Sequence, residues 1–168
     1  MEIKEAIYKR RSIRKFKDQK VDGKIIEELL HLAMAAPSAV NARPWEFYVI
    51  ENPSVLNNFY LTFQSMHYHA PLAIVVCANE LNMYPKAKDY WIQDCSAAIE
   101  NILLGALSFS LGSVWCGITP QEEKVAQVKR ILSLGDNIIP LGLVYLGYPD
   151  EEKEPRDQYD KSKVRYIK

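Results

Sequence analysis

One long apolar helix constrains this chain more than any other feature of its sequence. The run from Trp91 to Leu111 is apolar on almost every side, which a helix tolerates only when protein surrounds it. Its most apolar part, Ala97–Leu111, contains Glu100 and Asn101 and is shorter than the roughly 20 residues that a membrane span needs. We therefore expect a helix buried inside a layered fold, and no membrane association.

Four short runs around this helix have the composition of strands. Pro71–Ala78 and Ile138–Gly147 are apolar and rich in β-branched residues, as strands covered on both faces are. Shorter strands are expected at Glu46–Ile50 and Ser113–Ile118. Helical spacing and capping signals predict further helices over residues 2–8, 22–36, 54–65 and 120–134. With no repeat and no linker, the pattern indicates a single domain over residues 1–168.

Charge and cysteine content argue against several classes of protein. The chain carries 21 lysines and arginines against 21 acidic residues, whereas a duplex-binding protein needs a basic excess to neutralise phosphates. Its three cysteines form no CxxC pair, which argues against a disulfide framework or a zinc site. The amino terminus lacks the apolar core of a secretory signal. We expect a cytoplasmic protein with no nucleic-acid partner.

Several motifs that bind nucleotides or metals are missing. No two of the seven glycines are spaced as GxG, so the sequence has neither a Rossmann fingerprint nor a P-loop. HExxH and GxSxG are absent too. His67 and His69 alternate as metal ligands on a strand can, but no third ligand is obvious nearby, and we expect no metal. A bound phosphate would therefore have to be held by side-chain cations.

The first group of cations is the run Arg10-Arg11-Ser12-Ile13-Arg14. In an extended segment Arg10, Ser12 and Arg14 would point to one side and offer two guanidinium groups and a hydroxyl. Such a set suits a phosphate and a neighbouring polar ring. A solvated basic turn is the alternative, and the residues alone favour neither.

Three further segments offer groups that the same ligand could use. The loop from Pro37 to Trp45 carries a hydroxyl, an amide and an indole between stiffening prolines, although a purely structural turn is the alternative. Trp115–Pro120 ends a strand with a glycine, and we expect its backbone N–H groups to be free for a ligand. Near the carboxyl terminus, Lys161 and Lys163 alternate and could close on one phosphate.

Together, the order and spacing of these segments resemble the FMN-dependent nitroreductase family. The resemblance implies an α+β fold, a three-layer α-β-α sandwich with a mixed central sheet. It also implies a homodimer with FMN in clefts at the subunit interface. The matching runs, which cover nearly the whole chain, are RRSIRKF, AAPSAVNARPWEF, APLAIVVCA, QDCSAAIENILLGA, GSVWCGITP and IIPLGLVYLGYP with its basic tail.

The resemblance also assigns flavin contacts. Two departures from the family pattern stand out: Arg43 replaces a frequent glutamine, and little chain lies between Asn79 and Tyr90. By this resemblance, the flavin phosphate, ribityl chain and pyrimidine edge would be held by Arg10, Arg11, Ser12 and Arg14. The partner subunit would contact the same flavin through Pro37, Ser38, Ala39 and Asn41. The isoalloxazine ring would lie along Cys116, Gly117 and Ile118, and the phosphate site would be completed by Lys161 and Lys163.

The implied activity is that of a flavoenzyme. NADH or NADPH would pass a hydride to FMN and leave, and a flat acceptor such as a nitroaromatic or a quinone would follow in a ping-pong cycle. We expect no indispensable acid or base, and Arg14 is the cation expected to stabilise negative charge on the flavin. Two alternatives are another reaction on the same fold, such as flavin reduction or dehalogenation, and a flavin-binding module without turnover.

Overall fold

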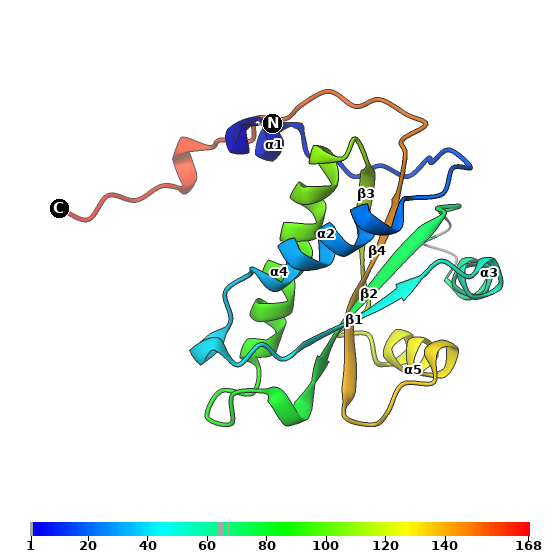
Figure 1. Cartoon of the computed structure of the whole chain (residues 1–168). Helices are drawn as coiled ribbons and strands as arrows, with labels where there is room; N and C mark the ends of the chain where they lie inside the picture. Colours follow the sequence, from blue (N-terminus) through cyan, green and yellow to red (C-terminus); the bar gives the residue numbers. More distant parts are fainter. Residues whose placement is uncertain (1, 64–65, 67) are drawn as a thin grey trace.

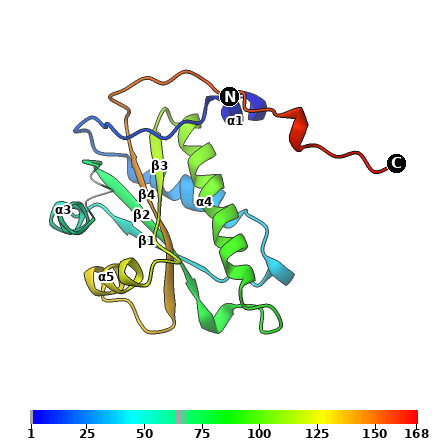
Figure 2. The same ribbon diagram turned by 180° about the vertical axis from the view of Figure 1, so that it is seen from behind.

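A four-stranded sheet lies between two layers of helices (Figures 1 and 2). The computed structural model describes residues 2–63, 66 and 68–168. Helices α2 and α4 cover one face of the sheet, and α3 and α5 cover the other, which confirms the expected α+β fold with helices on both faces. The α-helices are α1 (Ile3–Lys9), α2 (Gly23–Met34), α3 (Pro53–Thr62), α4 (Tyr90–Ser108) and α5 (Glu122–Leu132). The strands are β1 (Trp45–Ile50), β2 (Leu72–Asn79), β3 (Gly112–Gly117) and β4 (Ile138–Gly147), and the 3-10 turns are η1 (Ala39–Asn41), η3 (Glu80–Asn82) and η4 (Lys161–Lys163).

The sheet differs from the expectation in the direction of its strands. The order is β1-β2-β4-β3, and every neighbouring pair is antiparallel. The expectation of a mixed sheet is therefore wrong for these strands; within the described residues, parallel pairing is limited to an isolated bridge between Ser12 and Ser113. Helices that alternate with strands along the chain do not fix strand direction, because each connection can re-enter the sheet at either end. That choice depends on tertiary packing.

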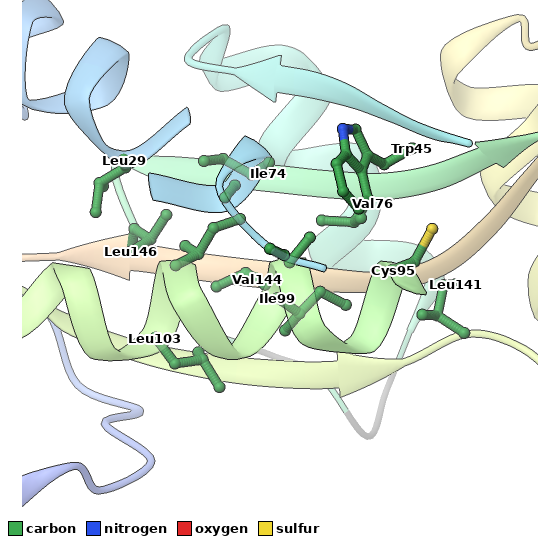
Figure 3. Packing of buried hydrophobic residues seen from close by; sticks show 14 of the residues in the cluster. Leu29, Trp45, Ile74, Val76, Cys95, Ile99, Leu103, Leu141, Val144 and Leu146 are labelled. Atoms are coloured by element: carbon green, nitrogen blue, oxygen red, sulfur yellow. The ribbon is translucent and has the colours of Figure 1, made fainter. Parts of the chain in front are cut away.

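Strand β2 is buried along almost its whole length because its side chains alternate between two cores. Ile74 and Val76 enter the core under α2 and α4 (Figure 3). Ala73 and Val75 enter the core under α3 and α5. An apolar side chain at every position is what a strand covered on both faces requires. This confirms the interpretation of the Pro71–Ala78 run.

Helix α4 is the buried helix that the apolar run predicts. Its Ile99 and Leu103 pack against the sheet (Figure 3). The helix ends at Ser108, earlier than expected, because Ser110 takes the left-handed conformation with φ of 57° and turns the chain toward β3. No helix within the described residues is long and apolar enough to cross a membrane.

Two acidic residues within α4 connect this helix to other parts of the chain. Asp94, only 7% exposed, accepts a hydrogen bond from the Ala39 N–H at 2.9 Å. Glu100 lies 3.5 Å from the Nε of Arg10. A buried carboxylate is tolerated when a donor satisfies it, which explains Asp94, whereas Glu100 is exposed and needs no such compensation. The two contacts also attach the loop at η1 and the basic run to the same helix, at different positions along it.

Candidate functional site

The basic run that follows α1 lies along strand β3. Ser12 bridges Ser113, and the Ile13 N–H donates to the Ser113 carbonyl oxygen at 2.9 Å. Ile13 also packs closely over Gly112, where an added Cβ would come within 2.7 Å of the isoleucine side chain. The run is thus attached to the sheet through residues 12 and 13, and its charged side chains lie at the surface.

These charged side chains line a concave site of about 480 Å³, which we call the cationic hollow. Its walls come from α1, the basic run and the segment that follows β4. Five of its lining residues are arginines or lysines, and five cations gathered around one concavity create a field that attracts anions. This arrangement favours an anion site over a solvated basic turn. The lining residues are Ile7, Tyr8, Arg10, Arg11, Ser12, Arg14, Lys153, Arg156 and Gln158.

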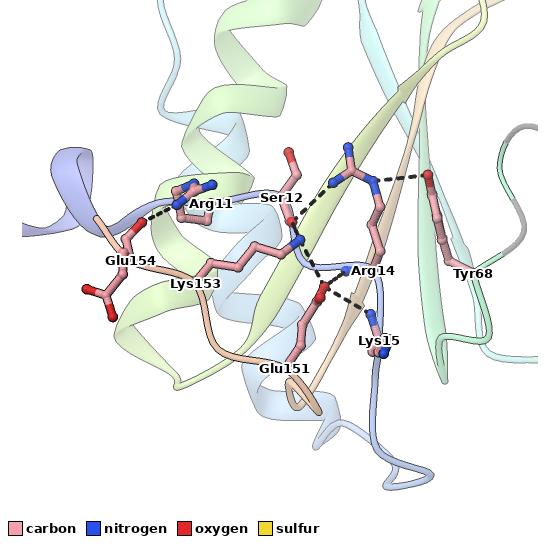
Figure 4. Close-up of polar contacts among 8 residues, drawn as sticks. All are labelled: Arg11, Ser12, Arg14, Lys15, Tyr68, Glu151, Lys153 and Glu154. Carbon is pink, nitrogen blue, oxygen red and sulfur yellow. Dashed lines mark hydrogen bonds and ion pairs between the residues drawn. The ribbon is translucent and has the colours of Figure 1, made fainter. Parts of the chain in front are cut away.

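Sequence reasoning missed two of these cations, Lys153 and Arg156. They belong to the mixed-charge run DEEKEPR after β4, which has no periodicity and carries more acidic than basic residues. The Lys153 ammonium donates to the Ser12 carbonyl oxygen at 2.7 Å (Figure 4), and the Arg156 N–H donates to the Tyr8 carbonyl oxygen at 3.2 Å. These contacts bring the tail back over the basic run, which no local signal in the sequence indicates.

Arg14 points from the basic run toward Tyr68 (Figure 4). Its Nε donates to the Tyr68 hydroxyl at 3.1 Å, and its guanidinium carbon lies 5.9 Å from the centre of the tyrosine ring. Tyr68 in turn meets Tyr145 edge-on, with ring centres 5.7 Å apart. Because Tyr145 is buried, the aromatic pair is anchored in the core. Its contacts with the Arg14 guanidinium fix the orientation of that side chain.

A second concave site, of about 280 Å³, adjoins the cationic hollow because both are lined by Arg10 and Ser12. We call it the Trp115 hollow. Trp115 is 37% exposed although most of β3 is buried. A Cβ added at Gly117 would meet no atom within 4 Å, so the strand end is open on this side. Two adjoining hollows therefore share Arg10 and Ser12, and one of them is lined mainly by cations while the other contains an indole. The remaining lining residues are Glu100, Leu103, Trp115 and Gly117.

Cys116 and Ile118 lie beside the Trp115 hollow, but their side chains are buried in the core under α3 and α5. Burial raises the pKa of the Cys116 thiol to about 11. The N–H groups of Ile118 and Thr119 both donate to the Leu141 carbonyl oxygen, at 3.0 and 3.2 Å. The prediction that backbone donors are free at this strand end is therefore wrong for these two residues. Of the three contacts predicted here, Gly117 is the one that lines the hollow.

The loop around η1 lies apart from both hollows. In Figure 1 it is found at the opposite end of α4 from α1. Besides the bond from Ala39 to Asp94, the Ser38 hydroxyl accepts a hydrogen bond from the Arg43 N–H at 3.0 Å. The chain alone therefore does not bring the predicted loop contacts to the cationic hollow. Those contacts are Pro37, Ser38, Ala39 and Asn41, and neither hollow of the described chain includes them.

Lys161 and Lys163 also lie apart from the cationic hollow. They form the exposed turn η4 in a tail that extends away from the layered body (Figures 1 and 2). Neither lysine is among the residues that line the hollow. Lys153 and Arg156, which precede them on the same tail, occupy that position instead.

A larger cleft of about 650 Å³ lies near α3, but none of the predicted contacts line it. It is lined by both lysines and carboxylates, and the Lys20 ammonium lies 3.5 Å from the Glu51 carboxylate. His69, on its wall, stacks on Tyr60 with ring centres 4.1 Å apart. His67 lies outside the described residues. Because this cleft carries charges of both signs, it does not favour an anionic or a cationic ligand. We therefore place the candidate site at the two adjoining hollows.

Comparison with known proteins identifies relatives over nearly the whole chain. The model of the nitroreductase family matches residues 7–62 and 56–148. A protein of Methanothermobacter thermautotrophicus named "Putative NADH dehydrogenase/NAD(P)H nitroreductase" is 40% identical over 170 residues, which cover 100% of this chain and 88% of that protein. A "Putative NADH Oxidase" of Clostridium acetobutylicum has a solved structure that is 40% identical, with a TM-score of 0.91 and coverage of 97% of this chain and 99% of its own. The "FMN-dependent Nitroreductase" of Clostridium difficile R20291 is 30% identical, with a TM-score of 0.87 and coverage of 97% and 98%.

Proposed function

Because the chain belongs to the nitroreductase family, we propose that it is an FMN-dependent oxidoreductase. In this proposal FMN, when bound, accepts a hydride from NADH or NADPH and then reduces a flat acceptor such as a nitroaromatic or a quinone, in a ping-pong cycle. The observation that carries the proposal is that the cationic hollow and the Trp115 hollow adjoin each other at Arg10 and Ser12. FMN has a matching shape, with an anionic phosphate at one end and a flat ring at the other.

The cationic hollow fits the phosphate end of FMN. Arginine forks and a hydroxyl are well suited to phosphate oxygens, and a concave group of cations offsets two negative charges better than a flat surface does. The residues proposed to hold the phosphate and ribityl chain are Arg10, Arg11 and Ser12, with Lys153 and Arg156 as additional cations. Lys161 and Lys163 stay proposed contributors that the tail would have to bring into contact.

The Trp115 hollow fits the flat end of the cofactor. An indole and a strand end without a side chain at Gly117 leave room for a planar ring. Cys116 and Ile118 would contact that ring only through their backbones, since their side chains are buried. Arg14, oriented by Tyr68, is the cation proposed to stabilise negative charge on the ring.

We further propose a homodimer in which the partner subunit supplies the loop contacts. Two observations support this arrangement. Pro37, Ser38, Ala39 and Asn41 are distant from the cationic hollow of their own chain, so a second copy is needed to bring them there. The apolar side chains of α1 also lack cover: Ile3 is 72% exposed and Ile7 is 55% exposed. Exposed apolar residues on a terminal helix are typical of a subunit interface.

The same proposal includes a single domain over residues 1–168, a cytoplasmic location, and either NADH or NADPH as the electron donor. One experiment tests its centre. The absorbance spectrum of the purified protein is recorded, and NADH or NADPH is then added without oxygen. Flavin bands that bleach on addition support the oxidoreductase. A colourless protein that cannot be reconstituted with FMN would contradict it. Light scattering tests the dimer, and a monomeric mass with FMN bound would rule out the shared site.

A further inference from the structure

Two side chains of the tail, the Glu151 carboxylate and the Lys153 ammonium, form hydrogen bonds with the backbone of the basic run (Figure 4). The Glu151 Oε1 accepts hydrogen bonds from the Arg14 N–H at 2.5 Å and the Lys15 N–H at 3.3 Å. The same oxygen lies 3.1 Å from the Lys153 ammonium, which itself donates to the Ser12 carbonyl oxygen at 2.7 Å. One ion pair therefore contacts the backbone of the basic run on both sides of Ile13.

This ion pair has the properties of a positioning device. The side chains of Lys153 and Glu151 are only 23% and 20% exposed, so their interaction is less screened than that of a surface pair. Hydrogen bonds from the Arg14 backbone and the proximity of Lys153 lower the pKa of Glu151, which keeps this carboxylate charged. A carboxylate acceptor binds backbone N–H groups more strongly than a neutral one does.

The basic run has few other attachments: Ile13 is bonded to Ser113, the Arg11 guanidinium donates to the Glu154 carbonyl oxygen, and Lys15, just beyond the run, accepts a hydrogen bond from the Asp150 N–H. It contains no helix or strand, and its main attachment to the sheet is at residues 12 and 13. Its neighbouring positive charges repel one another, and Glu100, 3.5 Å from Arg10, offsets this repulsion only at one end of the run. The position of Arg14 thus depends on Tyr68 at its guanidinium and on Glu151 at its backbone.

We propose that Glu151, paired with Lys153, is a positioning residue for FMN binding: it holds Ser12 and Arg14 in the conformation that the cofactor requires, without touching the cofactor itself. This inference rests on the proposed function. The inference assigns a supporting role to Glu151, although a negative charge near a phosphate site would by itself repel the phosphate. Its contribution comes from pre-organisation, which strengthens binding because the ligand no longer has to order the run.

The test is the dissociation constant of FMN for the full-length chain freed of flavin, followed by flavin fluorescence. Glu151→Ala is expected to weaken FMN binding about 10- to 100-fold, because hydrogen bonds to a charged group are lost. Glu151→Gln, which keeps an acceptor oxygen but loses the charge, should fall between this variant and the unmodified chain. Glu152→Gln is the matched control, since Glu152 is the exposed neighbour and should bind FMN as the unmodified chain does.

Two further measurements separate positioning from a general structural role. Thermal unfolding of the flavin-free Glu151→Gln variant should match that of the unmodified chain, because the site lies outside both cores. In an Arg14→Ala background, Glu151→Gln should weaken FMN binding less than it does alone, because one residue acts through the other. Unchanged affinity in Glu151→Gln and Glu151→Ala, or effects that simply add to that of Arg14→Ala, would overturn the inference while leaving FMN binding intact. An unmodified chain that fails to bind FMN would overturn the proposed function and this inference with it.

Discussion

The indole of Trp115 lies directly over Gly142 on the neighbouring strand β4. A Cβ added at Gly142 would come within 2.9 Å of the Trp115 Cδ1 and still closer to its Nε1. Glycine at position 142 therefore provides the space that the indole occupies. The indole forms part of the wall of the Trp115 hollow, so Gly142 influences the shape of this hollow although it does not line it.

Gly142→Ala is expected to displace the indole. The free energy of unfolding should fall by about 1–3 kcal/mol, the usual cost of overpacking. Denaturant unfolding measures this loss, and a shift in tryptophan emission reports the movement of the ring. In a Trp115→Ala background the same substitution should cost much less, because the clash is gone. Equal costs in the two backgrounds would be inconsistent with this contact.

Arg10→Ala combined with Arg14→Ala should give protein that purifies without flavin. Both guanidinium groups line the cationic hollow, and charge-assisted hydrogen bonds to an anionic ligand, whether to its phosphate or to its ring, are among the stronger contacts a site can make. We expect FMN affinity to fall at least roughly 100-fold. Lys9→Ala is the control, because Lys9 pairs with Glu5 on α1 and does not line the hollow. Full flavin content in the double variant would refute the assignment of this cluster.

The two pairs of tail cations can be compared at equal change of charge. Lys153→Ala with Arg156→Ala should weaken FMN binding more than Lys161→Ala with Lys163→Ala. The first pair lines the cationic hollow, whereas the second lies on the exposed turn η4. Titration with FMN at several salt concentrations measures both effects and corrects for long-range attraction. A larger loss from the second pair would show that the tail brings η4 to the phosphate when FMN binds.

The three cysteines should react slowly with thiol reagents in the folded protein at pH 8. Burial raises the pKa of Cys116 to about 11 and that of Cys95 to about 12, and it raises the pKa of Cys77 further. A thiol whose pKa is raised stays protonated below that value, and the thiolate is the reactive form. Counting thiols by a colorimetric reagent before and after denaturation checks this. Fast labelling of one cysteine in the native state would place a thiol in the solvent-open site.

Much of the fold follows from the local sequence. The Ile138–Gly147 run forms β4 with the bounds expected, and the apolar run near residues 91–111 forms the buried helix α4. Local patterns predict such elements because periodicity and burial on both faces act on neighbouring residues. The basic run Arg10–Arg14 is also recognisable from the sequence as a cluster of cations, since its charges are near one another in the chain.

Only the tertiary structure determined which residues far apart in the sequence come into contact. The antiparallel direction of β1 against β2, the return of Lys153 to Ser12, and the contact of Trp115 with Gly142 have no local signature. Even the side-chain direction of Cys116 depends on which face of β3 meets α3 and α5. A sequence by itself determines which segments become helices, strands or charged runs. Which of them meet to form a site is decided by long-range packing, because contact energies between distant segments are realised only once the layers have assembled.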